Sequence, residues 1–328
     1  MLKILPMDSF PKPKLFASRC LGFESCRYDG GIIHDAFIDK LKPYVEVITV
    51  CPEKKIELGV PRDPVRLVIQ NNRKHMYQPA TGRDITDRME SFTNEYLDKL
   101  EDVDGFILKH KSPSCGLGSV KIFSGFEGKV QHSRGAGLFG EAVMKKFAGF
   151  PVEDEGRLRN FSIREHFLTR LFTIAAFREL KKHGKMKDLV DFHSNNKMLF
   201  MAYNQKQMRE LGRITANPDH LNTQEVISQY EAHMLGLLKT MPRFTSWINM
   251  IQHAFGFISD DLEAGEKKFF LNSIEEYRDE RIPLSVLIKL LNSYALRFNQ
   301  DYLLRQTFLN PFPLELVDIT DSGKGRNL

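Results

Sequence analysis

Residues 14–20 read KLFASRC and residues 44–51 read YVEVITVC, so two short apolar runs each lead into a cysteine. Runs of this length, rich in aliphatic and β-branched residues, are typical of buried strands. Similar runs occur at residues 65–70 (VRLVIQ) and 105–109 (GFILK). Because helical stretches separate the runs, the sequence predicts an α/β domain whose parallel sheet is covered by helices.

Two helices are expected to cover this sheet. The first spans residues 85–100, where apolar side chains recur at helical spacing and form one face: Ile85, Met89, Phe92, Tyr96, Leu97 and Leu100. The second is expected over residues 138–147. After the polar connector at residues 150–156 the strand signals stop, which predicts a first domain that covers residues 1–156.

Residues 157–328 are expected to form an all-α domain, helical to about Gln306. Ser162 and Glu165 have the spacing of a capping box, which predicts a helix start at this point. A second apolar stripe, residues 284–298, predicts a later helix. The tail at residues 321–328 is expected to be frayed.

Composition and charge limit the classes of function. The chain has 328 residues, 42% of them hydrophobic and 27% charged, which fits two domains of ordinary size. The net charge of +5 is mild and the basic clusters are short, so a dedicated nucleic-acid binder is disfavoured. No apolar run is long enough to span a bilayer, and residues 1–6 lack a secretory signal. The sequence therefore predicts a cytoplasmic protein without a membrane partner.

All four cysteines, Cys20, Cys26, Cys51 and Cys115, lie within the first 115 residues of the chain. In a reducing compartment, thiols grouped in this way indicate metal binding or catalysis before disulfides. The absence of a CxxC pair disfavours a zinc ribbon, a thioredoxin-type dithiol and a ferredoxin-type run.

Three of these cysteines follow predicted strands. Cys20, Cys51 and Cys115 come after the runs at residues 14–18, 44–50 and 105–109, and loops at the carboxyl ends of parallel strands converge on one crevice. Soft thiolates select zinc, copper(I) or an iron-sulfur cluster. Three thiolates leave one iron of a cluster open to a sulfur-bearing ligand. The alternative, buried cysteines that act as small hydrophobes, fits poorly because their contexts are loop-forming.

At these residues the sequence resembles the thiouracil desulfurase family of bacterial proteins. The resemblance spans residues 14–156, and the matching segments are residues 20–30 (CLGFESCRYDG), 51–53 (CPE), 59–62 (GVPR), 111–116 (KSPSCG) and 135–139 (GAGLF). The resemblance implies a Rossmann-like fold. The second half is similar to a YbgA-like helical domain, through residues 192–197, 201–204, 282–284 and 309–313, and this likeness implies no activity.

The resemblance implies that Cys20, Cys51 and Cys115 hold a 4Fe-4S cluster, and that Cys26 is a neighbour and not a ligand. It implies a non-redox, hydrolytic desulfuration of a thiolated pyrimidine, such as a 2-thiouracil-like base or nucleotide, with release of sulfide. Glu53 matches the acid/base of the family, and Ser112 matches a serine that orients substrate or water. A surface glutamate and a serine that caps a turn are the alternative interpretations.

Further side chains are weaker candidates. Arg27, Tyr28, Asp29 and Ser114 are expected either to contact the pyrimidine or to support the loops around it. In the helical half, His166, His193 and Lys197 are interpreted as ordinary helix side chains before anion contacts.

Two alternatives stay open. The chain could be an interaction or sensing protein with a structural cluster, whose helical domain binds a partner or nucleic acid. The helical domain could also cover the crevice and select a larger thiolated nucleoside or an RNA end. The sequence leaves the oligomeric state open.

Overall fold

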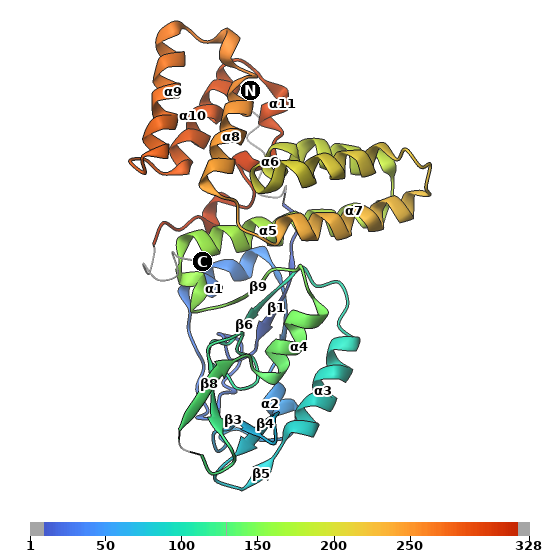
Figure 1. The fold of residues 1–328 in the computed structure, drawn as a ribbon, viewed down its shortest axis with the longest axis vertical. Coiled ribbons are helices and arrows are strands. Elements are labelled where there is room, and N and C mark those ends of the chain that lie inside the picture. Colours follow the sequence, from blue (N-terminus) through green and yellow to red (C-terminus); the bar gives the residue numbers. More distant parts are fainter. Residues whose placement is uncertain (1–9, 129, 321–328) are drawn as a thin grey trace. The chain divides into compact units, whose positions relative to one another are not determined.

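Residues 10–128 and 130–320 are described by the computed structural model, which has an α/β region followed by a mostly helical region (Figure 1). This confirms the predicted fold class. Among the described residues, those up to Ala175 form one compact unit together with residues 315–320, and Ala176–Leu314 form a second unit. The domain limits 1–156 and 157–328 follow the change from strands to helices and stay a prediction.

A parallel sheet of four strands lies in the first unit, with the order β2-β1-β6-β9. Its strands are β1 (Lys14–Ser18), β2 (Glu46–Val50), β6 (Gly105–Leu108) and β9 (Val152–Asp154). The first three confirm the predicted runs. The second strand begins two residues later than expected, because Lys42–Tyr44 forms a 3₁₀ turn. All four residues of β6 are buried, as expected for a strand covered on both faces.

A second sheet was not predicted. It has the order β5-β4-β3-β7-β8, and only β3 and β7 are parallel. Its strands are β3 (Arg66–Gln70), β4 (Arg73–Gln78), β5 (Arg83–Asp84), β7 (Val120–Ser124) and β8 (Gln131–Gly135). The run at residues 65–70 is therefore a strand, as predicted, but its placement in the parallel sheet was wrong. The tight connection through Asn71 and Asn72, both with positive φ, returns the chain as an antiparallel hairpin.

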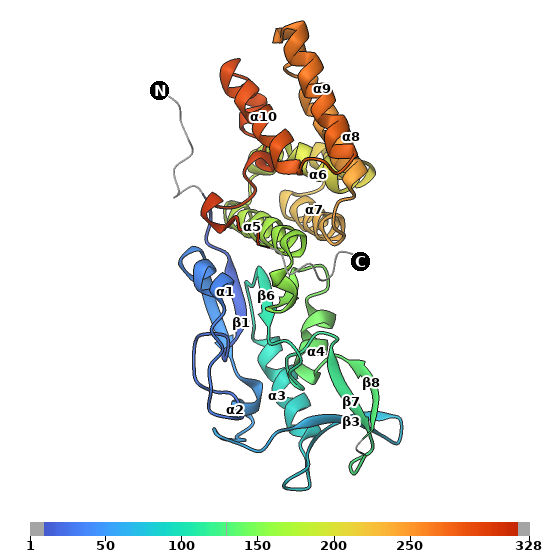
Figure 2. The same cartoon turned by 90° about the vertical axis from the view of Figure 1, so that its left-hand side faces the viewer.

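Two helices join these sheets into one structure. α3 (Thr86–Asp98) and α4 (Leu138–Lys146) confirm the predicted helices and lie side by side along one flank of the unit (Figures 1 and 2). Met89 of α3 packs into the core under the second sheet, whereas Leu97 of the same helix packs into the core of the parallel sheet. The unit is completed by α1 (Ala36–Leu41) and the short α2 (Pro52–Lys55).

The chain from residue 161 is helical, as predicted. Its helices are α5 (Phe161–His183), α6 (Met186–Ala216), α7 (Thr223–Leu238), α8 (Phe244–Phe255), α9 (Ala264–Arg278), α10 (Leu284–Arg297) and α11 (Asp301–Leu304). α10 confirms the predicted stripe. The capping box was wrong: the side chain of Asn160 accepts a hydrogen bond from the amide of Ile163 at 3.0 Å, so Asn160 caps α5 and Ser162 lies inside the helix. The predicted frayed tail lies outside the described residues.

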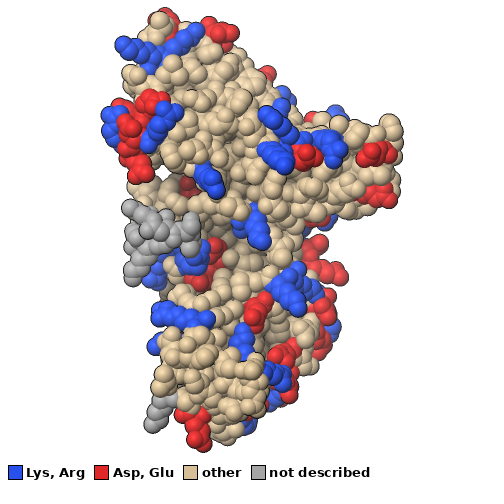
Figure 3. Space-filling model, viewed as in Figure 1, with Lys and Arg blue, Asp and Glu red and all other residues tan. Residues whose placement is uncertain are grey.

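Charge on the visible surface is mixed. On the face in Figure 3, basic and acidic side chains are interspersed over both units. Such a surface agrees with the mild net charge. None of the helices in the described ranges combines the length and the apolar content that crossing a bilayer requires.

Candidate functional site

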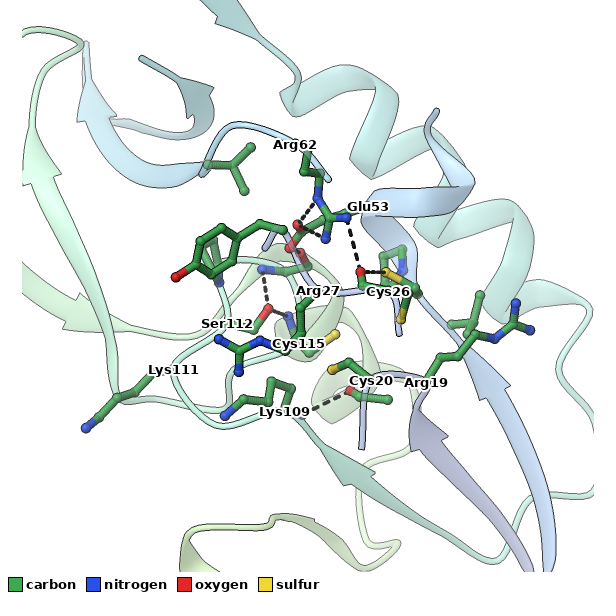
Figure 4. Close-up of a pocket in the computed structure, with 18 of the residues that line it drawn as sticks. Arg19, Cys20, Cys26, Arg27, Glu53, Arg62, Lys109, Lys111, Ser112 and Cys115 are labelled. Carbon is green, nitrogen blue, oxygen red and sulfur yellow. Dashed lines mark hydrogen bonds and ion pairs between the residues drawn. The ribbon is translucent and has the colours of Figure 1, made fainter. Parts of the chain in front are cut away.

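Three cysteines follow three neighbouring strands of the parallel sheet. Cys51 comes directly after β2, Cys20 lies in the turn after the central strand β1, and Cys115 lies in the loop after β6. All three line one cavity of about 460 Å³, together with Cys26. Figure 4 shows the side chains of Cys20, Cys26 and Cys115 around this cavity. The structure therefore brings the three predicted ligands together at one edge of the sheet.

The loop that carries Cys115 is held by its own side chains and by α4. Ser112 Oγ accepts hydrogen bonds from the amides of Ser114 at 3.3 Å and of Cys115 at 3.1 Å. The N-terminal end of α4 approaches this loop closely: a Cβ at Gly137 would lie 2.4 Å from the carbonyl oxygen of Ser114, and one at Gly140 would lie 2.7 Å from that of Cys115. Glycine is therefore required at both positions of α4 to leave room for the loop.

Cys26 occupies the same wall of the cavity and is fully buried. Its thiol contacts the thiols of Cys20 and Cys51. Its carbonyl oxygen accepts hydrogen bonds from Cys51 Sγ at 3.7 Å and from Arg62 Nη1 at 3.1 Å (Figure 4). This loop therefore fixes the position of Cys51 through its backbone.

The electrostatic state of the thiols follows from their burial. Contact with Cys20, together with burial, raises the pKa of Cys26 to about 11 although the Cys51 thiol acts in the opposite direction. Contact with Cys26 and burial raise the pKa of Cys51, and burial raises the pKa of Cys115 to about 12. Without a bound cation these thiols stay protonated, and a metal that binds them must displace protons.

Glu53 is a buried carboxylate at the same cavity. Both Nε and Nη2 of Arg62 donate to its Oε2, at 2.8 and 2.6 Å. Its other oxygen, Oε1, accepts a short hydrogen bond from the hydroxyl of Ser114. The side chains of Arg62 and Glu53 are 4% and 11% exposed, so the ion pair is shielded from solvent (Figure 4). A carboxylate held in this way is available as an oriented proton acceptor.

A second, basic cavity of about 340 Å³ shares Val65, Lys111 and Pro113 with the first. Its other basic residues are Arg66, Lys121 and Arg134, and none of its lining residues is acidic. Lys121 and Arg134 lie directly opposite each other on β7 and β8. Like charges in a cross-strand pair repel each other, so this cavity is suited to an anion.

The sequence profile of the 2-thiouracil desulfurase family matches residues 15–155, which cover all of these residues. YbbK of Bacillus subtilis (strain 168) is 30% identical to the chain over 155 residues, which cover 44% of this chain and 98% of that protein. The chain belongs to the 2-thiouracil desulfurase family. This family assignment confirms the resemblance found in the N-terminal half of the sequence.

Beyond this desulfurase domain, the profile of a protein family of unknown function, DUF1722, matches residues 197–313. YbgA of Escherichia coli (strain K12) is 25% identical over 158 residues, which cover 48% of this chain and 93% of YbgA. A solved structure of a [4Fe-4S]-dependent thiouracil desulfidase, TudS, is 28% identical, with a TM-score of 0.36 and coverage of 45% of this chain and 93% of that chain. The match to the DUF1722 profile and the similarity to YbgA confirm the YbgA-like second half.

Other predicted residues of the desulfurase domain lie near the cavity in different ways. Arg27 and Tyr28 line it, whereas Asp29 supports the loop: it accepts from Arg27 Nε at 3.1 Å and from the amide of Gly31 at 3.0 Å. Ser114 contacts Glu53 and is fully buried. Ser112 performs the capping role that was its alternative interpretation, and its role toward a substrate stays a prediction.

None of the weaker candidates His166, His193 and Lys197 is among the residues that line this cavity. His193 is half-buried in an aromatic group, where its Nδ1 lies 3.0 Å from the hydroxyl of Tyr230. Burial lowers the pKa of His193 to about 4. A neutral, hydrogen-bonded histidine agrees with the interpretation of an ordinary helix side chain.

Sequence reasoning gave no role to Arg62, and it did not single out His110 or Asp154. Arg62 stands in the segment 59–62 that carried the family resemblance, so its position was marked although its function was not. His110 stands beside the segment 111–116 and lines the cavity. Asp154 had no signal in the sequence, because the side chain that it contacts, His110, comes from a distant segment of the chain.

Proposed function

We propose that this chain is an enzyme that removes sulfur from a thiolated pyrimidine by hydrolysis and releases it as sulfide, with a 4Fe-4S cluster held by Cys20, Cys51 and Cys115. The observation that carries the proposal is the position of these thiols after three adjacent parallel strands, on one cavity that also holds a buried carboxylate. Membership of the 2-thiouracil desulfurase family supports the substrate class.

The donor set fits such a cluster. In the described ranges, no three His, Cys, Asp or Glu side chains converge as ligands of a single metal ion. A 4Fe-4S cluster does not require three ligands to converge on one metal ion, because each thiolate binds its own iron. Three soft donors on one cavity, of which Cys51 and Cys115 have raised pKa values, agree with a group that carries its own positive charge. When bound, the cluster would supply an iron without a protein ligand, a Lewis acid toward the sulfur of the thiocarbonyl.

The residues of the chain would move the protons. Glu53, paired with Arg62, accepts a proton from the water that attacks the thiocarbonyl carbon. Ser114 holds Oε1 of Glu53 and so fixes the direction of the carboxylate. Arg27 and Tyr28, at the mouth of the cavity, would contact the ring of the substrate.

The second cavity favours a nucleotide over a free base. A cavity of about 460 Å³ accommodates a pyrimidine, because small-molecule sites start at roughly 300 Å³. The adjoining basic cavity would bind a phosphate through Lys111, Lys121 and Arg134. We expect a thiolated uridine 5′-monophosphate to react with a lower KM than the corresponding base.

The direct test is an assay of the protein purified without oxygen. Iron and acid-labile sulfide are quantified, and sulfide release is measured from 2-thiouracil and from a thiolated uridine 5′-monophosphate. We expect about four irons per chain, by the definition of the cluster, together with turnover of at least one substrate. A colourless protein with stoichiometric zinc contradicts the proposal.

A matched pair of variants tests the nucleotide preference. Arg134→Gln should raise KM for the nucleotide and leave KM for the base unchanged, because it removes one phosphate contact. Lys99→Gln, an exposed residue of the same unit outside both cavities, serves as the control.

A further inference from the structure

His110 is a side chain of the cavity to which neither the sequence nor the family assignment gives a role. It follows β6 and lines the same cavity as the cysteines. Its Nδ1 lies 3.1 Å from Oδ2 of Asp154 and 3.2 Å from the hydroxyl of Ser119. The imidazole is therefore held by a carboxylate and a hydroxyl on one of its two nitrogens.

The carboxylate is itself fixed. Asp154 is the last residue of β9, in register with Leu108 of the neighbouring strand β6. Its side chain is 4% exposed, and its Oδ1 accepts from the amide of Arg157 at 2.9 Å. Two adjacent parallel strands thus deliver an acid and an imidazole to the same edge of the sheet.

The backbone around His110 is also held in place. Glu155 Oε2 accepts from the amide of His110 at 2.7 Å, and Lys109 Nζ pairs with Glu155 and donates to the carbonyl oxygen of His110 at 2.8 Å. A Cβ at Gly156 would lie 3.2 Å from Cγ of His110. Glycine at this position therefore leaves room for the ring. The charged groups around the imidazole are Asp154, Glu155 and Lys109.

This geometry has a consequence for the tautomer of the ring. A carboxylate oxygen 3.1 Å from Nδ1 favours a proton on Nδ1 and stabilises the imidazolium, in which Nε2 carries a second proton that can be given away. Within the described ranges, the ring's hydrogen bond is between Nδ1 and the hydroxyl of Ser119, and the carboxylate of Asp154 is its ion-pair partner. An imidazole oriented by a carboxylate is the usual arrangement of a side chain that transfers protons.

The proposed reaction needs such a group. In the overall change, C=S + H₂O → C=O + HS⁻ + H⁺, a C–O bond forms and the C–S bond breaks with its electron pair on sulfur. Glu53 takes one proton from the attacking water, and the second leaves as the carbonyl forms. The departing sulfur needs a proton from a different donor, because Glu53 has to stay a base until attack is complete.

We propose that the imidazolium form of His110, oriented by Asp154, gives the proton on Nε2 to the departing sulfur, which leaves the ring protonated on Nδ1 alone, and that Nε2 then regains a proton from solvent. This role rests on the proposed function of the cavity. Glu53 is then the base for water, and His110 is the acid for sulfide. No oxidant or reductant is required, because both side chains transfer only protons.

A second pair in the same unit provides a matched control. His75 Nδ1 lies 2.7 Å from Asp84 Oδ2, so the chemistry of the pair is the same. This pair lies on β4 and β5 of the second sheet, and neither residue lines the cavity of the cysteines. Any effect that is specific to His110 and Asp154 therefore comes from their place at the cavity.

The experiment compares His110→Gln, Asp154→Asn, their double variant and His75→Gln at equal iron content. We expect kcat to fall about 100-fold for the first two, the low end for acid–base catalysis, with no further fall in the double variant and no change for His75→Gln. His110→Ala should recover part of its activity with added imidazole, which a structural role would not allow.

The tautomer gives a readout that does not depend on turnover. Two-bond ¹H–¹⁵N spectra of the metal-free protein should show the His110 proton on Nδ1, and a mixture of tautomers in Asp154→Asn. A wild type that releases no sulfide contradicts the proposed function and this role with it. An active wild type that His110→Gln matches in kcat, or a neutral His110 whose single proton is on Nε2, contradicts this role alone.

Discussion

Arg62 donates two hydrogen bonds to a single oxygen of Glu53, Oε2, and so leaves Oε1 to Ser114. The arrangement holds a buried carboxylate in one orientation at the cavity. We expect Glu53→Gln to keep the shape of the side chain, with its amide nitrogen donating to Ser114 where the carboxylate accepted, and to remove the proton acceptor. Turnover should fall by at least about 100-fold, as measured by kcat/KM for sulfide release.

The control for this variant is Glu57→Gln, an exposed carboxylate close by in the sequence. It should have the activity of the wild type. If Glu53→Gln retained full activity at the same iron content, Glu53 would not be the base.

The same ion pair makes a prediction about stability. Arg62→Met removes the partner of a carboxylate that burial prevents water from solvating, and we expect a loss of about 3–5 kcal/mol in the free energy of unfolding. Urea unfolding of the metal-free protein measures it. Arg73→Met removes an exposed residue that pairs with Asp87 and Glu90, and should cost less than about 1 kcal/mol. Equal losses in the two variants would show that the buried ion pair contributes no more to stability than the exposed one.

The buried thiols predict how the stability of the metal-free protein depends on pH. Burial raises the pKa of Cys115 in the folded protein to about 12 from the ordinary thiol value of 9.0. A raised pKa means that the folded state holds the proton more tightly, so its contribution to stability is complete below pH 9 and is lost as the pH rises toward 12. Chemical denaturation between pH 8 and 11 should therefore show a decline in stability. Cys115→Ser should flatten this decline, and a decline unchanged by that variant would contradict the assignment.

The limit of the desulfurase domain can be tested by truncation. The first half of α5 packs on this domain: a Cβ at Gly105 would lie 2.8 Å from Leu171, and Arg170 donates to the carbonyl oxygen of Gly149 at 2.7 Å. We expect a fragment of residues 1–183 to unfold at a higher Tm than a fragment of residues 1–156. Equal Tm values would place the limit at residue 156, as the sequence pattern predicts.

Three strands of the parallel sheet could be predicted because they are continuous apolar runs, whereas β9 (Val152–Asp154) is mostly acidic and was missed inside the expected connector. Lys14–Ser18 and Gly105–Leu108 are buried on both faces, so hydrophobicity alone marks them. The second sheet could not, because strands such as Gln131–Gly135 are mostly polar and are held by pairing with β7. The start of α5 was misassigned because Asn160 and Ser162 are both good caps, and only tertiary context selects one of them.

Site residues that follow a strand could be predicted from the sequence, whereas contacts between side chains of distant segments could not. Cys20, Cys51 and Cys115 converge because parallel strands end at the same edge. Glu53 was found through its place beside Cys51. Its partner Arg62 and the pair of His110 with Asp154 were missed, because contacts between distant segments leave no local pattern.

The central claim is that three thiols of this chain, and not the fourth, hold one cluster. The most direct measurement is the iron and acid-labile sulfide content, with the visible spectrum, of Cys20→Ser, Cys51→Ser, Cys115→Ser and Cys26→Ser purified without oxygen. The account predicts that each of the first three loses the cluster and that Cys26→Ser keeps it. A Cys26→Ser protein without iron, or a Cys51→Ser protein with a full cluster, would contradict it.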